Sequence, residues 1–154
     1  MSGKVADVII AETGGDMSLF PDAKHLASWA GVAPGSNQSG PRAKPARVRP
    51  GDTYLKAALG IAALSAARNK KTYFSAQYRR VATRRGPMKA LVAVENSIIT
   101  SVWYMLTRDT EYIDPGPDYF TRRRPDTAKT RAVSQLEALG YTVTLTTTKE
   151  PMAK

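Results

Sequence analysis

The chain has 154 residues, which is enough for one compact domain with a buried core. It contains no cysteine and one histidine, His25, which excludes disulfide frameworks, thiolate metal sites and histidine metal clusters. The formal net charge of +10 is concentrated in residues 35–89, which hold thirteen Lys and Arg against one acid, Asp52, while the rest of the chain sums to −2. Such a block favours a polyanionic partner, and a solvated charged face is the ordinary alternative.

No export signal is visible at the start of the sequence. The first ten residues, MSGKVADVII, carry one Lys and a short apolar stretch that Asp7 interrupts, so we expect a cytoplasmic protein. The most apolar segment, residues 91–106, contains Glu95, Asn96 and Ser97 near its middle, which favours a buried helix over a membrane span. We therefore expect no membrane partner.

Two helices are predicted before the basic block. Apolar residues at helical spacing, followed by two glycines, predict a short helix over residues 4–13. Asp22 is the expected N-cap of a second helix over residues 23–30, in which Leu26 and Trp29 should face the core. We read the acids around these helices as capping and solubilising groups rather than as metal ligands.

A basic loop, residues 33–52, follows the second helix. It is too rich in Gly and Pro to form a helix or an inner strand, and it places the hydroxyl of Ser39 beside Gly40. Its cations are Arg42, Lys44, Arg47 and Arg49. A hydroxyl nucleophile among cations suggests phosphodiester chemistry. The ordinary alternative is a turn serine bonded to the local backbone, and Ser36 competes for the same chemical role.

The helix after the loop reads as a buried central strut. Asp52 is its expected N-cap, and the helix should cover residues 53–68. Its predicted inner face consists of Leu55, Ala58, Leu59, Ala62 and Ala63. Lys70 and Lys71 follow its C-terminal end, where they suit the helix dipole and a bound phosphate equally well.

Thr72 is the expected cap of the next helix, which forms a second candidate surface for a polyanion. Its aromatic and apolar residues mark one stripe, with Tyr73 and Tyr78 expected to serve the core. Four arginines gather elsewhere on it: Arg79, Arg80, Arg84 and Arg85. Arginines that only keep an amphipathic helix soluble are an equally good interpretation.

A long helix over residues 88–106 should follow Gly86 and Pro87. Beyond it we expect an extended connection, a helix over residues 126–139 and a strand over residues 141–147. The predicted fold is mainly α, a compact helical domain with a basic Gly/Pro-rich active-site loop and a small C-terminal β element. Residues 1–107 would form its core, and residues 108–154 a linker, helix and strand extension of the same domain.

Several segments together resemble a known family. They are residues 14–54, with GGDMSLFPDAKHLASWAGVAPGSNQSG before the basic run and GDTYL; TYFSAQYRRVATRRG at residues 72–86; the apolar run 91–106; and DYF with LEALGYTVTL near the end. Their order and spacing resemble the C-terminal catalytic-serine domain of the IS-one-ten family of insertion-sequence transposases. Those enzymes are bridge-RNA-guided recombinases.

The resemblance implies a role for Ser39, which falls where that family has its catalytic serine. Its hydroxyl would attack a DNA phosphorus and leave a temporary phosphoserine link, with the basic residues on the DNA backbone. Implied partners are DNA, as element ends and target, a guide RNA, and further copies of the chain. The family often carries a histidine where this chain has Asn96.

Members of that family also have an N-terminal RuvC-like domain whose acids hold divalent metal, and nothing here matches it. We therefore expect no cofactor in this chain, Mg²⁺ only in such a domain, and nucleic-acid binding without recombination by the chain alone. Three hypotheses stay open: the serine-bearing half of a guided recombinase, a non-catalytic basic DNA- or RNA-binding module, and an assembly unit.

Overall fold

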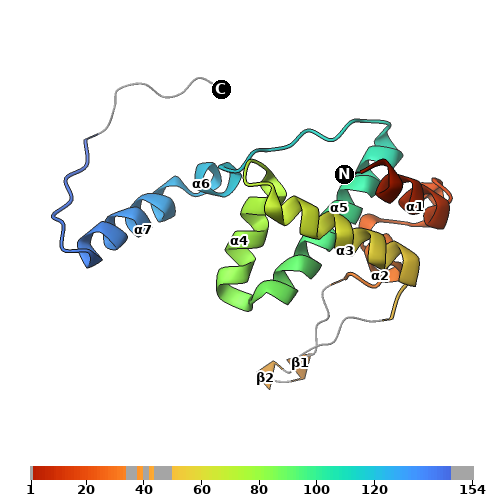
Figure 1. The fold of residues 1–154 in the computed structure, drawn as a ribbon, viewed down its shortest axis with the longest axis horizontal. Coiled ribbons are helices and arrows are strands. Elements are labelled where there is room, and N and C mark those ends of the chain that lie inside the picture. Colours follow the sequence, from red (N-terminus) through yellow and green to blue (C-terminus); the bar gives the residue numbers. More distant parts are fainter. Residues whose placement is uncertain (1, 34–37, 40–41, 44–49, 147–154) are drawn as a thin grey trace. The chain divides into compact units, whose positions relative to one another are not determined.

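The computed structural model of the protein describes residues 2–33, 38–39, 42–43 and 50–146, and it is mainly α-helical, as predicted (Figure 1). The chain forms two compact units, Met1–Asp118 and Tyr119–Lys154, and each is described by itself. The first unit contains α1 (Gly3–Thr13), η1, a 3-10 turn (Met17–Leu19), α2 (Ala23–Trp29), β1 (Gln38–Ser39), β2 (Arg42–Ala43), α3 (Thr53–Arg68), α4 (Tyr73–Arg85) and α5 (Pro87–Arg108). The second contains α6 (Tyr119–Arg123) and α7 (Pro125–Ala138).

The three predicted N-caps are confirmed. Asp22 Oδ1 accepts a hydrogen bond of 2.8 Å from the backbone N–H two residues ahead, at the start of α2. Asp52 Oδ1 accepts one of 2.7 Å from Leu55 N in α3, and Thr72 Oγ1 one of 3.3 Å from Ser75 N in α4. Each cap satisfies a backbone donor that the first helical turn leaves without a partner.

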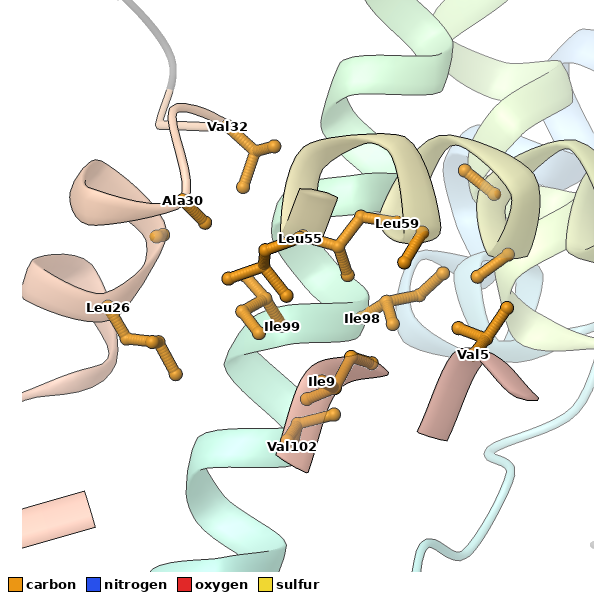
Figure 2. Close-up of a cluster of buried hydrophobic side chains, with 14 of the residues drawn as sticks. Val5, Ile9, Leu26, Ala30, Val32, Leu55, Leu59, Ile98, Ile99 and Val102 are labelled. Atoms are coloured by element: carbon orange, nitrogen blue, oxygen red, sulfur yellow. The ribbon is translucent and has the colours of Figure 1, made fainter. Parts of the chain in front are cut away.

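The core of the first unit is built around α5, which packs against η1, α2, α3 and α4, while α1 packs on α3. All five predicted inner residues of α3 are buried. Figure 2 shows the cluster in which side chains from α1, α2 and α3 meet α5: Val5, Ile9, Leu26, Leu55, Leu59, Ile98, Ile99 and Val102. Burying apolar side chains of this size contributes about 1.5–3 kcal/mol each, so this cluster is the main source of stability.

By length and composition, α5 also meets the criteria for a membrane-crossing helix, with a mean hydropathy of 1.2 over its most apolar window. A core helix of a globular domain meets the same criteria. Its residues Val94 and Ile99 are fully buried against the other helices of the first unit, and Trp103 Nε1 donates to the Phe20 carbonyl at 3.2 Å. These contacts agree with the predicted buried helix.

Two predictions about the fold were wrong. Trp29 was expected in the core, but 41% of it is exposed and its ring packs against Phe20, with centroids 5.5 Å apart. The buried residues of the short helix α2 include Leu26 and Ala27, and Trp29 lies at its C-terminal end. The predicted C-terminal strand does not form over residues 141–146, because a lone strand without a pairing partner is not stable.

The segment that follows α5 returns to α4. Asp114 Oδ1 accepts a hydrogen bond of 3.0 Å from Tyr73 N, and the Tyr112 ring stacks on Phe74 with centroids 5.4 Å apart. The first unit therefore extends to Asp118, beyond the linker start that we predicted at residue 108. That residues 119–154 belong to the same domain stays a prediction.

One carboxylate is buried between α3 and α5. Glu95 is 9% exposed, and its Oε1 would lie 3.6 Å from a Cβ placed at Gly60. Burial raises the pKa of Glu95 above its ordinary 4.5, and the opposing attraction of Lys56 does not offset this. Because the raised folded-state pKa favours the neutral acid, the stability it contributes is present below pH 4.5 and is lost as the pH rises through the folded pKa.

Replacing Glu95 by glutamine, its neutral isostere, should therefore remove the contribution of this side chain to the pH dependence of stability. We expect Glu95→Gln to melt at a higher temperature than the wild type at pH 7, with the gain shrinking as the pH falls to about 4. Thermal melts followed by circular dichroism across that range measure it, with Glu111→Gln at an exposed position as the control. A gain that is the same at both pH values would contradict the assignment.

Candidate nucleic-acid interface

The basic loop leaves the helical core through a glycine. Gly31, with φ 69°, adopts the left-handed conformation that ends α2. Val32 N then donates to the Ala27 carbonyl at 3.0 Å, and Ala33 N donates to the same oxygen at 3.1 Å. This is the hydrogen-bond pattern of a glycine-terminated helix, and it fixes the direction in which the loop departs.

The second end of the basic loop returns to the C-terminal end of α2, where the loop departs. Asp52 N donates to the Trp29 carbonyl at 3.2 Å. A Cβ on Gly51 would lie 2.5 Å from the Gly31 Cα and from the Ala30 carbonyl carbon, and closer still to Gly31 N. Only glycine fits where two backbones approach this closely. We call the five residues Ala30, Gly31, Val32, Gly51 and Asp52 the loop base, since they hold the two ends of the loop together.

Asn96 of α5 also contacts the loop base. Its Nδ2 donates to the Val32 carbonyl at 3.4 Å, and the Val32 side chain is fully buried. Figure 2 shows Val32 and Ala30 beside the α3 and α5 side chains of the core. Asn96 therefore lies at the foot of the basic loop, where its side chain contacts the backbone of the loop base.

Within the loop, two short strands pair in antiparallel fashion. Gln38 pairs with Ala43, and Ser39 with Arg42, so the predicted nucleophile and the first predicted phosphate ligand occupy opposite positions of one hairpin. Ser36, Lys44, Arg47 and Arg49 lie outside the described residues. For Ser39 and Arg42 the structure describes the backbone only.

The arginine-bearing half of α4 lies near the level of the loop base. Gln77 Nε2 donates to Ser97 Oγ at 2.8 Å and to the Ala93 carbonyl at 3.4 Å, which places it level with the turn of α5 that carries Asn96. The Phe74 and Tyr78 rings pack against the core, as predicted for Tyr78. The predicted phosphate ligands of this helix are all exposed: Arg79, Arg80, Arg84 and Arg85.

The remaining predicted cations are separated from the loop. Lys70 and Lys71 are exposed in the turn between α3 and α4, whereas the loop base adjoins the N-terminus of α3. A helix rises 1.5 Å per residue, so the 16 residues of α3 put about 24 Å between the two places. The structure places Lys70 and Lys71 away from the loop base.

The acids of the first unit do not offer a metal site. Asp16 Oδ1 accepts from Ser18 N at 2.9 Å, and Asp22 caps α2, so both act as the predicted capping groups. Hydrogen bonds from Ser18 lower the pKa of the Asp16 carboxyl, and hydrogen bonds from His25 lower the pKa of the Asp22 carboxyl. Over residues 2–33 and 50–146, no three His, Asp or Glu side chains converge as a metal ion would require.

Sequence reasoning missed the loop base and the arginines of the second unit. Gly31 and Gly51 flank the basic loop in the sequence, and a glycine on each side was a usable signal for a close approach of the two ends. Arg122, Arg123 and Arg124 form an uninterrupted run in and after α6, and all three are exposed.

Residues 1–79 match the profile of the Transposase IS116/IS110/IS902 family. The chain belongs to this transposase family. The match covers about half of the 154 residues, and it includes the whole basic loop, the loop base and α4 up to Arg79. No curated protein and no solved structure matches the chain. Transposases act on DNA, so membership of the family implies that the protein interacts with DNA.

Closure of the loop base can be tested at Gly51. We expect Gly51→Ala to lower the free energy of unfolding by about 1–3 kcal/mol, because the added methyl group meets backbone atoms that cannot rotate away. Urea denaturation measures it. Gly3→Ala is the matched control, since nothing lies within 4 Å of a Cβ at that position. Equal stability of the Gly51 variant and the wild type would refute the contact.

Proposed function

We propose that this transposase binds DNA with its basic loop and α4, and that Ser39 is the nucleophile of DNA strand exchange. The observation that carries the proposal is the loop base, which fixes both ends of a cationic, serine-bearing loop to a packed helical core. Sites that transfer phosphoryl groups depend on positioning and charge more than on covalent catalysis by the protein. A loop whose two ends are fixed at one place can supply the positioning.

The proposed step is a transesterification. A bond forms between the Ser39 oxygen and a DNA phosphorus, and the bond from that phosphorus to a deoxyribose oxygen breaks. The departing deoxyribose oxygen takes up the serine proton in net terms and becomes a hydroxyl. One phosphoester bond forms as one breaks, so their number is conserved. Arg42 stands opposite Ser39 in the hairpin register, and we propose that it stabilises the developing negative charge together with Lys44, Arg47 and Arg49.

The remaining parts of the reaction come from outside this chain in our proposal. Divalent metal belongs to a RuvC-like domain, target choice belongs to a guide RNA, and the chain by itself binds the element ends and the target without recombining them. The protein would act in the cytoplasm, where its DNA is.

A second candidate function, binding without catalysis, is favoured by α4. Its arginines are exposed while Phe74 and Tyr78 hold the helix on the core, so the cationic face needs no rearrangement to meet DNA. In that case the hydroxyl of Ser39 would be dispensable, and charge alone would determine affinity.

We further propose that copies of the chain pair through α3. Its outer face exposes Tyr54 (73%), Ile61 (61%) and Leu64 (46%), and these share a heptad-like spacing with Ala57 and Arg68. If two copies of α3 paired in antiparallel fashion at Ile61, Leu64 of one copy would face Ala57 of the other, and Tyr54 would face Arg68. A guanidinium group facing an aromatic ring is a favourable pair.

If the copies pair in this way, Ile61→Glu should reduce the mass measured by light scattering, and Ile10→Glu on α1 should not. A wild-type chain that is already monomeric would exclude the pairing.

Covalent trapping tests the catalytic proposal. With a RuvC-like domain supplied in trans and a nicked DNA substrate, we expect a phosphoserine adduct, detected by mass spectrometry, that is lost in Ser39→Ala. Ser36→Ala is the matched control and should still form the adduct. An adduct that survives Ser39→Ala would discard the assignment of the nucleophile.

Salt titration tests the contribution of α4. For duplex DNA, the slope of log K against log salt should fall by about 0.9 for each phosphate that the protein no longer neutralises, so Arg79→Ala combined with Arg84→Ala should lower it by nearly 2. Lys24→Ala, at an exposed position of α2, should leave the slope unchanged. An unaltered slope in the double variant would mean that these arginines only solubilise the helix. A chain that serves assembly alone would show no steep loss of affinity with salt.

A further inference from the structure

A cavity of about 350 Å³ lies in the first unit, between the C-terminal half of α3, the start of α4, α5 and the segment that follows α5. Aliphatic side chains of α3 and α5 make up most of its floor. The other lining groups are two aromatic rings and five polar side chains: Phe74, Tyr112, Ser65, Asn69, Thr72, Ser101 and Asp114. This volume is at the lower end of the range for ligand sites and suits one ring system.

The aromatic part of the lining is flat and accessible. The Phe74 and Tyr112 rings are stacked, with centroids 5.4 Å apart and planes 9° from parallel, and Tyr112 is 39% exposed. Burial of the rest of the Tyr112 side chain, with the nearby Asp114, raises the pKa of its hydroxyl to about 12, so this group remains a neutral hydrogen-bond donor. A planar ligand entering the cavity meets this stacked pair.

The polar part of the lining is held in place and retains capacity for a ligand. Asp114 Oδ1 accepts from Tyr73 N at 3.0 Å and from Gly116 N at 2.7 Å, and Asn69 Oδ1 accepts from Lys71 N at 3.2 Å. These bonds engage one oxygen of each side chain. The second Asp114 oxygen is an acceptor, and the Asn69 amide nitrogen is a donor. A hydrogen-bond acceptor and a donor in the same lining can bind the edge of a nucleobase.

Positive charge adjoins the cavity. Lys70 and Lys71 lie in the chain between Asn69 and Thr72, which both line it, and both lysines are exposed. They are also the cations that the fold removes from the basic loop, so they have no part in the proposed site around Ser39. Stacking surface, base-edge partners and adjacent cations are the components of single-strand binding sites.

We propose that this cavity binds an unstacked nucleobase of single-stranded DNA, with Lys70 and Lys71 on the adjoining phosphates. The inference rests on the proposed DNA-binding function and deepens it. A transposase separates DNA strands from their usual partners during exchange, and a site of this kind holds an extruded base away from the basic loop.

Binding of short oligonucleotides to the whole chain tests the inference. Fluorescence anisotropy should show tighter binding of oligo-dC than of an abasic oligomer of equal length. Tyr112→Leu should weaken oligo-dC binding about tenfold or more, because it removes the stacking face. Asp114→Asn keeps the acceptor for Tyr73 N and should also weaken oligo-dC binding, because an amide group replaces the second carboxylate oxygen that would accept from the cytosine amino group. Binding of duplex DNA should change less than about twofold in either variant.

The outcomes separate this inference from the proposed function. If the wild type binds neither single strands nor duplex, the DNA-binding function itself fails. If duplex binding persists while oligo-dC affinity is the same in Tyr112→Leu, Asp114→Asn and the wild type, the cavity does not bind a base and an apolar protein side chain is its occupant. Tighter binding of the matching oligoribonucleotide would overturn the assignment to DNA. Photocrosslinking of an iodocytosine oligomer should map to Phe74 or Tyr112, and crosslinks elsewhere would contradict the site.

Discussion

The organisation of the first unit depends on one close approach of two backbone segments, Gly51 against Ala30 and Gly31. This contact joins the end of α2 to the start of α3, and it closes a loop that carries concentrated positive charge. Like charges within such a loop repel one another, so the ends must be held by interactions that do not involve them. Backbone hydrogen bonds, the buried Val32 side chain and the Asn96 amide provide these interactions.

The helix α5 links this loop base to the other parts of the unit. It carries Asn96 beside the loop, Glu95 against α3, and the serine that accepts the hydrogen bond from Gln77 of α4. The single helix α5 therefore positions the loop base, the arginine-bearing helix α4 and the cavity far from the loop base. Lys70 and Lys71 lie about 24 Å along α3 from the loop base.

The sequence predicted what local chemistry decides. Helix α3 begins and ends at the predicted residues, and the N-caps of α2, α3 and α4 are the predicted Asp22, Asp52 and Thr72, because capping and helical periodicity act within a few residues. It could not predict contacts between distant segments, such as the approach of Gly51 to Gly31 or the stacking of Tyr112 on Phe74. The predicted strand over residues 141–147 failed for the same reason, since alternation is local and a pairing partner is not. The role of Ser39 stays a prediction.

Native-state hydrogen exchange tests the central claim most directly. The Val32 and Asp52 amides donate to the Ala27 and Trp29 carbonyls across the loop base. If the loop base is an integral part of the helical core, both amides should exchange only through global unfolding, with the same free energy as the amide of the buried residue Leu59 in α3. Exchange of either amide at the rate of an unprotected peptide, while Leu59 stays protected, would contradict the account.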